Sequence, residues 1–271
     1  MSASVAFNFC ALVALLPAAL VRWRRNDARD VLFYAALLLA VGGPLAWSAA
    51  QVIGAWRTGF ATSLWVTIAA TMLLFLGLVA TTRQAWRLTP LLLPYLVLLG
   101  ILATIWQHAP ERPIAETIPA AWLDLHIVFA LGTYGLVTLA AVAGTAVFLQ
   151  ERAIKVKQPT ALTRLLPAVA ESESLEIRLL YAAEIVLALG VASGLATQHV
   201  SGVTSLALDN KTLFSLAALV VIAVVLIARR WSGLRGRRAA RWALIAYLLL
   251  TLAYPGVKFV TDVLMGRTPV A

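Results

Sequence analysis

Eight long apolar runs follow one another along this chain of 271 residues, separated by short segments with charged or turn-forming residues. The hydrocarbon core of a bilayer is about 30 Å thick, so a helix of about 20 apolar residues crosses it. The runs cover residues 5–21, 31–53, 62–80, 90–106, 121–150, 179–197, 212–228 and 242–264. They predict an all-α integral membrane protein with about eight transmembrane helices in one bundle.

Composition supports this interpretation and excludes a separate soluble domain. Hydrophobic residues make up 62% of the chain, whereas soluble proteins have roughly 45–50%. We therefore expect one polytopic membrane domain over residues 1–271, with four helices in residues 1–106 and a second region in residues 121–264. Cys10 is the single cysteine, which excludes an internal disulfide and a cluster of thiolate metal ligands.

The lysines and arginines predict which side of the membrane each end of the chain faces. Seventeen of the 22 lie in segments on one side, and short loops rich in these residues stay in the cytoplasm. The five on the other side are Arg57, Arg112, Lys211, Lys258 and Arg267. Both termini are expected on the periplasmic side of a bacterial inner membrane. The net charge of +10 reflects this topology and contact with the headgroups of the lipid bilayer, so no nucleic-acid partner is expected.

The fifth run, residues 121–150, is longer than a membrane crossing requires. As a helix it would extend for about 45 Å, so it must tilt or project into the cytoplasm. The segment that follows, residues 151–178, contains Pro159, Pro167 and three glutamates. It is predicted to form one or two short amphipathic helices at the membrane surface.

The sequence carries no familiar enzyme motif. It has no glycine-rich phosphate loop with lysine, no His-Glu-x-x-His and no Gly-x-Ser-x-Gly, so we expect a protein that is not an enzyme. What remains is three histidines, His108, His126 and His199, and the predicted topology places all three at the outer side. His108 lies beside Pro110 and is interpreted as a loop residue.

His126 has the most informative surroundings, because helical spacing puts Trp122, Phe129 and Thr133 on its face. An imidazole framed by aromatic rings suits haem, whose iron takes a neutral histidine nitrogen and whose macrocycle needs apolar walls. An interfacial histidine in a belt of aromatic residues explains the same pattern. His199 lies in the segment 198–210, from which it would supply a second axial ligand or remain a solvated loop residue.

The last apolar run carries a polar stripe at helical spacing. Its members are Tyr247, Thr251, Tyr254, Lys258 and Asp262. Such a stripe must face protein or water. Lys258 would then meet a haem propionate or a conducted anion, or the stripe is a packing face with an interfacial ion pair. Pro255 is expected to kink this helix.

The run of residues 179–197 contributes one acid and two glycines. Glu184 lies near the cytoplasmic end of this run. Extension of its carboxylate to the membrane–water interface is the favoured interpretation, and a proton or ion site is the alternative. Gly190 and Gly194 have the Gly-x-x-x-Gly spacing and are assigned to helix packing.

Several short stretches in the second half of the chain form one ordered pattern. They are Leu125-His126-Ile127, Gly132-Thr133-Tyr134-Gly135, Phe148-Leu149-Gln150-Glu151-Arg152, Leu166-Pro167, Ser174-Leu175-Glu176, Ala192-Ser193-Gly194, Asn210-Lys211-Thr212-Leu213-Phe214-Ser215, Leu234-Arg235-Gly236-Arg237-Arg238 and Leu252-Ala253-Tyr254. In order and spacing they resemble the cytochrome c assembly protein family, membrane proteins that handle haem and include CcsA and CcmC, and in particular its YpjD/HemX-like branch. The resemblance covers roughly residues 121–262, and the first four helices share only the apolar pattern.

The resemblance implies a role for His126 as the axial haem ligand on the outer side. The chain departs from the family pattern in two places: it lacks a Trp-rich segment in the outer loop, and Asn210 stands where many relatives have histidine. The leading hypothesis is an inner-membrane protein that binds or passes haem b near its outer face. Its site would consist of His126 and His199 as iron ligands, Trp122 and Phe129 as walls, and Lys258 as propionate partner.

Two other functions stay open: the missing Trp-rich segment and the polar stripe favour the first, and the long run 121–150 with the segment after it favours the second. One is a transport-associated protein or an accessory for ion or metal export, which would use Lys258 and Glu184. The other is a scaffold for a complex with other cytochrome c maturation or membrane proteins, which residues 151–178 would serve.

Overall fold

The computed structural model describes residues 3–24, 30–52, 57–109, 111–113, 120–200 and 210–265. The chain forms two compact units. Unit 1 consists of Met1–Pro113, Arg152–Pro167 and Lys258–Ala271, and unit 2 consists of Ile114–Glu151 and Ala168–Val257. The single polytopic membrane domain expected from the sequence stays a prediction.

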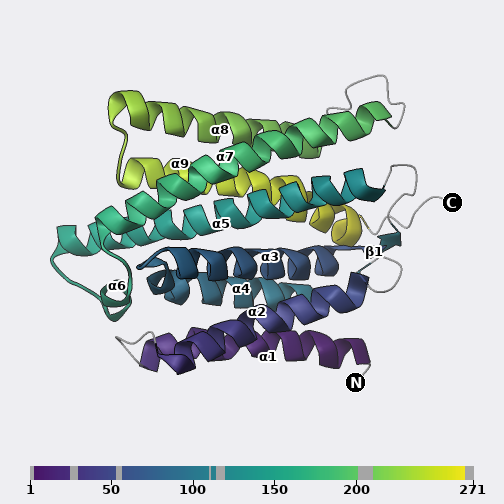
Figure 1. Ribbon diagram of the computed structural model, residues 1–271, viewed down its shortest axis with the longest axis horizontal. Coiled ribbons are helices and arrows are strands. Elements are labelled where there is room, and N and C mark those ends of the chain that lie inside the picture. The colour runs from purple at the N-terminus through teal and green to yellow at the C-terminus, as the bar shows by residue number, and fades with distance from the viewer. Residues whose placement is uncertain are drawn as a thin grey trace. The chain divides into compact units, whose positions relative to one another are not determined.

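Unit 1 is built mainly from the first four long helices (Figure 1). These are α1 (Ala3–Arg24), α2 (Val31–Val52), α3 (Phe60–Thr81) and α4 (Thr89–Ile105), with the 3-10 turn η1 (Ala85–Leu88) before α4. Helix α1 packs against α2 and α4, and α3 packs against the same two helices. A two-residue strand β1 (Arg57–Thr58) pairs antiparallel with β2 (Arg112–Pro113). The short helix α6 (Ala161–Leu165) and the π-helical turn η3 (Phe259–Leu264) complete the unit.

Three polar side chains inside unit 1 are joined by hydrogen bonds. The indole Nε1 of Trp65 donates to Asn8 Oδ1 at 2.6 Å, and Asn8 Nδ2 donates to Gln107 Oε1 at 2.9 Å. This chain of hydrogen bonds connects α1, α3 and the turn after α4. Pairing of this kind allows polar groups to lie among apolar helices, where an unsatisfied group is costly.

Unit 2 contains the remaining long helices (Figure 1). They are α5 (Ala120–Val156), α7 (Val169–Val200), α8 (Asn210–Ser232) and α9 (Arg237–Thr251), which continues into the π-helical turn η2 (Leu252–Gly256). Helix α8 packs against α7, α9 and η2. Close approach of α5 to α7 occurs at Gly132, where a Cβ atom would lie 3.4 Å from Val186 Cγ1.

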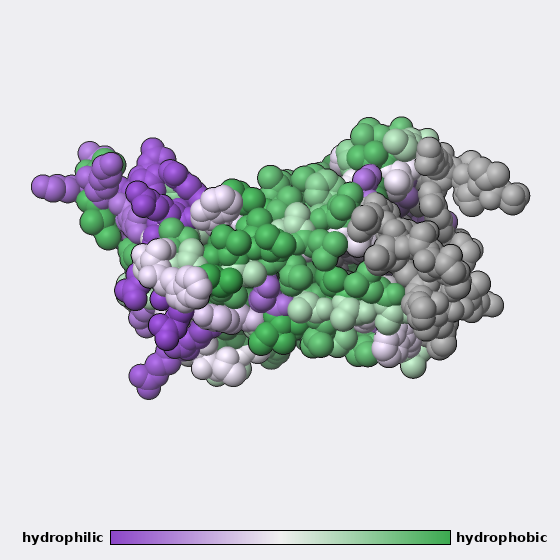
Figure 2. Space-filling view, turned by 90° about the horizontal axis from the view of Figure 1, so that it is seen from above, coloured by the Kyte–Doolittle hydropathy of each residue, from purple (hydrophilic) through white to green (hydrophobic). Residues whose placement is uncertain are grey.

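The turn between α8 and α9 is held by side chains of α5 and α7. Glu173 Oε1 accepts a hydrogen bond from the backbone N–H of Gly236 at 2.7 Å. The guanidinium group of Arg237 lies 4.3 Å from the ring centroid of Phe148, a cation–π contact. Figure 2 shows hydrophilic residues gathered at the end of unit 2 that contains this turn, beside a predominantly hydrophobic middle.

The structure confirms an all-α membrane protein. In the described part of the chain, seven helices are long and apolar enough to span a membrane, and Val5–Val21 forms a shorter apolar helix. The location of both termini on the periplasmic side stays a prediction. Pro255 lies within η2, where a π turn accommodates the missing N–H of proline in a continuous helical segment.

Two helices are longer than the apolar runs predict. Helix α5 has 37 residues and ends at Val156. Helix α7 has 32 residues and begins at Val169, so only α6 forms a separate short helix in the segment 151–178. The first turn of α7 is stabilised by Glu171, whose Oε2 accepts a hydrogen bond from the backbone N–H of Ala168 at 3.1 Å. Helix α7 also continues through His199, although the apolar run predicts that the helix ends before this residue.

Candidate functional site

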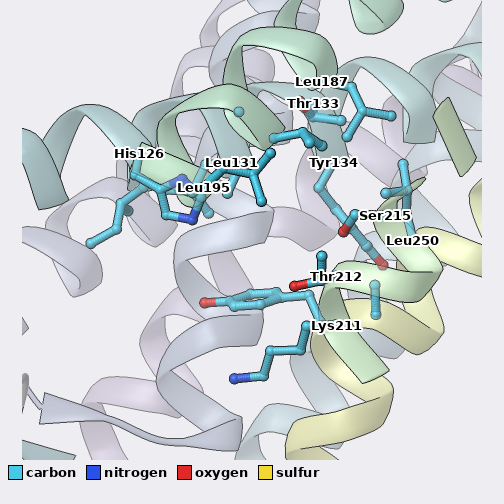
Figure 3. Close-up of a pocket in the computed structure, with 17 residues that line it drawn as sticks. His126, Leu131, Thr133, Tyr134, Leu187, Leu195, Lys211, Thr212, Ser215 and Leu250 are labelled. Carbon is cyan, nitrogen blue, oxygen red and sulfur yellow. The ribbon is translucent and has the colours of Figure 1, made fainter. Parts of the chain in front are cut away.

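A cavity of about 360 Å³ lies within unit 2, between α5, α7, α8, the end of α9 and η2 (Figure 3). Most of its lining is apolar. The polar side chains that line it are those of His126, Thr133, Tyr134, Lys211, Thr212, Ser215 and Tyr254. Ligand sites in proteins have this combination of apolar walls and a few fixed polar groups, with volumes of about 300–1,000 Å³.

His126 projects from α5 and is held by α7. Its Nδ1 lies 2.9 Å from Ser193 Oγ, and Ser193 Oγ donates to the carbonyl oxygen of Gly190 at 2.8 Å. The imidazole ring also lies close to Gly194, where a Cβ atom would be 3.0 Å from His126 Cε1. Gly194 therefore provides space for the ring, a role beyond the helix packing predicted for it.

Lys211 is the one cation among the described residues that line the cavity. It lies in the first turn of α8 and is exposed. In Figure 3 the His126 imidazole and the Lys211 ammonium group lie toward the same side of the view, and Ser215 and Leu250 lie toward the other. A flexible, charged side chain in this position is suited to meet a carboxylate of a bound molecule.

Hydroxyl groups from α5 and α9 lie close together at Tyr134, which lines the cavity. The Tyr134 hydroxyl lies 3.2 Å from that of Tyr247 and 3.3 Å from Thr251 Oγ1. Thr251 Oγ1 also donates to the Tyr247 carbonyl at 2.8 Å. Thr133 is 3% exposed, and its Oγ1 finds no hydrogen-bond partner within the described residues. The polar stripe of the last apolar run thus faces protein on its inner half, as predicted.

Lys258 and Asp262, the outer members of that stripe, belong to unit 1. Lys258 Nζ lies 3.4 Å from the carbonyl oxygen of Gly59. Asp262 is buried, and its Oδ1 accepts from Thr261 Oγ1 at 3.0 Å. Lys258 is not among the described residues that line the cavity in unit 2, whereas Lys211 and His126 both line it.

The other predicted site residues either do not line the cavity or lie outside the residues that the structure describes. Trp122 is 39% exposed on α5. Phe129 lies beside Gly190, where a Cβ atom would be 3.5 Å from Phe129 Cβ. Neither residue lines the cavity in the described part of the chain. The side chain of His199 lies outside the described residues, as does most of the segment 198–210, and His108 is exposed after α4.

Sequence reasoning found part of this site and missed the rest. The helical face of His126 correctly included Thr133, which lines the cavity. In the sequence, Ser193 is a member of one short family motif, and Lys211 is a basic residue of the outer side and a member of another such motif, so neither is predicted as a site residue. Across residues 3–24, 30–52, 57–109, 111–113, 120–200 and 210–265, no group of three or more His, Cys, Asp or Glu side chains could hold a metal ion.

Comparisons with known proteins extend the sequence resemblance. The family model described as Cytochrome C assembly protein matches residues 28–265. The match begins before the second helix, so it covers far more of the chain than residues 121–262. An uncharacterized 28.8 kDa protein in the nifR3-like 5′ region of Azospirillum brasilense is 52% identical over 271 residues, which is 98% of this chain and 100% of that protein. No solved structure matches.

Proposed function

We propose that this chain, which belongs to the cytochrome c assembly protein family, binds haem b in the cavity of unit 2 with His126 as an axial ligand. Family membership supports a membrane role in haem handling and cytochrome c assembly. One observation carries the finer proposal: a histidine ring and a single cation line the same apolar cavity in the described part of the chain.

The residues present fit the chemistry of haem. A neutral histidine nitrogen is a common axial ligand for haem iron. The Nδ1 atom of His126 is hydrogen-bonded to Ser193, so Nε2 would be the atom that binds the iron. Apolar walls for the macrocycle come from Leu131, Leu187 and Leu250. Lys211 would bind a propionate through a charge-assisted hydrogen bond.

The predicted topology assigns this cavity to the outer side of a bacterial inner membrane. Helix α8 starts beside the cavity with Lys211 and ends with Arg229 and Arg230. The turn after it adds Arg235, and the start of α9 adds Arg237 and Arg238 to the same end. Because basic loops remain in the cytoplasm, the opposite end of α8 and the cavity beside it would face outward.

Bound haem would supply an iron centre, and the chain would hold and orient it. His126 would bind the iron, Lys211 would fix the propionate edge, and the leucine side chains would exclude water. A second ligand from His199 stays part of the hypothesis. We propose binding, and passage of haem to other cytochrome c maturation or membrane proteins, rather than catalysis of a reaction.

Titration of the detergent-purified protein with haemin tests this proposal. The wild type is expected to bind haemin saturably, with a shifted Soret band. Replacing His126 by Ala should abolish the shift, and Lys211→Ala should raise Kd about 2- to 10-fold through loss of one hydrogen bond to the propionate. Lys258→Ala is the matched control, because Lys258 contacts Gly59 in unit 1, and it should leave Kd unchanged. A Kd that is insensitive to both His126→Ala and Lys211→Ala would reject the site.

A further inference from the structure

Ser193 lies between two hydrogen-bond partners, and one of them fixes the direction of both bonds. The carbonyl oxygen of Gly190 can only accept, so the 2.8 Å contact uses the single hydroxyl proton of Ser193. Bonds from serine to the carbonyl three or four residues earlier are common in helices. Toward His126, at 2.9 Å, Ser193 Oγ can then offer only a lone pair.

The direction of these bonds determines the tautomer of His126. Because Ser193 accepts, the Nδ1 atom of His126 must carry the proton. A neutral imidazole has one N–H group, so its Nε2 atom is left with a free lone pair. Ser193 is 6% exposed, and a buried hydroxyl has little access to water as a substitute partner.

The ring plane is restricted by the next residue of α7. A Cβ atom at Gly194 would lie 3.0 Å from Cε1, 3.6 Å from Nδ1 and 3.8 Å from Nε2 of His126. The imidazole therefore lies across the position that a side chain would occupy. Two consecutive residues of one helix therefore act on one ring: Ser193 determines which nitrogen carries the proton, and Gly194 leaves space for the Cε1 side of the ring.

We infer that Ser193 is a positioning residue that holds His126 in the Nδ1–H tautomer and presents Nε2 as the ligand nitrogen to the cavity. Metal-binding histidines generally donate their second ring N–H to an oxygen, which fixes the ring and raises its basicity. The consequence for haem rests on the proposed function, whereas the tautomer itself is a property of the protein without haem.

Nuclear magnetic resonance of protein labelled with nitrogen-15 in histidine tests the tautomer without haem. The chain has 3 histidines, so His126→Ala identifies the signals of His126. At alkaline pH, where imidazoles are neutral, we expect a protonated Nδ1 and a bare Nε2 at His126. In Ser193→Ala we expect a shift toward the other tautomer or a mixture. Ser48→Ala removes a serine hydroxyl that likewise donates to a carbonyl of its own helix, that of Pro44 in α2 of unit 1, and should leave the spectrum of His126 unchanged.

A haemin titration of the same variants tests the consequence for binding. Loss of such an outer partner weakens metal binding about 10- to 100-fold, so Ser193→Ala should raise Kd by that factor and shift the Soret maximum. Ser48→Ala should match the wild type. A wild-type spectrum with a bare Nδ1, or a Ser193→Ala variant with an unchanged tautomer, would overturn the inference.

The two experiments separate the inference from the proposed function. If the wild type binds no haemin and yet shows the Nδ1–H tautomer that depends on Ser193, the inference stands and the proposed function fails. If haemin binding depends on His126 while Ser193→Ala changes neither the tautomer nor Kd, the proposed function stands and the inference fails.

Discussion

Replacing Gly194 by Ala places a methyl group against the histidine that is proposed to bind iron. The new Cβ atom would lie 3.0 Å from His126 Cε1, whereas non-bonded carbon atoms pack at about 3.5–4.0 Å. The imidazole must therefore move by about 0.5–1 Å. Because the ring must return to its original position to bind iron, we expect the cost to appear as a loss of haem affinity.

The size of this loss follows from the energetics of overpacking. Forcing an extra methyl group into a packed position typically costs about 1–3 kcal/mol. Since each 1.4 kcal/mol is about tenfold in Kd, haemin should bind between about 5- and 150-fold more weakly. Gly190 is the matched control, because a Cβ atom there would lie 3.5 Å from Phe129 Cβ, an ordinary contact.

Haemin titrations of the two alanine variants, followed at the Soret band, measure this difference. Both variants replace a glycine of the same helix, so both gain the same helical preference of about 0.5–1 kcal/mol. Gly190→Ala is expected to bind haemin like the wild type. The account of the His126 pocket is refuted if Gly194→Ala also retains the wild-type Kd, or if Gly190→Ala loses as much affinity as Gly194→Ala.

Three further substitutions test the packing of unit 2, each by thermal unfolding in detergent. Gly236 has φ +61° and ψ −143°, a conformation suited only to glycine, so Gly236→Ala should cost about 1–3 kcal/mol; an unchanged midpoint would contradict this backbone geometry. Gly144→Ala would put a Cβ atom 2.8 Å from Oε1 of the buried Glu176 and should lower stability by about 1–3 kcal/mol, whereas equal stability would show that the carboxylate can move. Tyr134→Phe removes the hydroxyl shared with α9 and should cost about 0.5–1.5 kcal/mol with Kd for haemin unchanged; a large loss of haemin binding would argue against a purely structural role.

The sequence predicted the membrane helices well because apolar length is a strong and local signal. Helix α7 shows where this signal fails. Its first ten residues carry Glu171, Glu173 and Glu176, which interrupt the apolar run. In the structure Glu171 bonds to Ala168 N and Glu173 to Gly236 N, so two of these acids stabilise helix ends. The fold determines which hydrogen-bond partners these acids have, so the hydropathy of the sequence does not reveal them.

The site was predictable only on the helix that carries its central residue. Helical spacing placed Thr133 on the face of His126, and both line the cavity. Spacing within α5 cannot reveal which residues α7 and α8 bring to that face. Lys211 and Lys258 both lie on the predicted outer side, and only the structure shows that Lys211 lines the cavity of unit 2 whereas Lys258 contacts Gly59 in unit 1.

The most direct test of the central claim is to remove the proposed iron ligand and supply it again as a small molecule. Purified wild type and His126→Gly would be incubated with haemin, freed of excess, and examined by visible spectroscopy in the oxidised and dithionite-reduced states. We predict a Soret band in the wild type, its loss in His126→Gly, and its return when imidazole is added. A His126→Gly protein that retains the wild-type spectrum without imidazole would contradict the claim that His126 binds the iron.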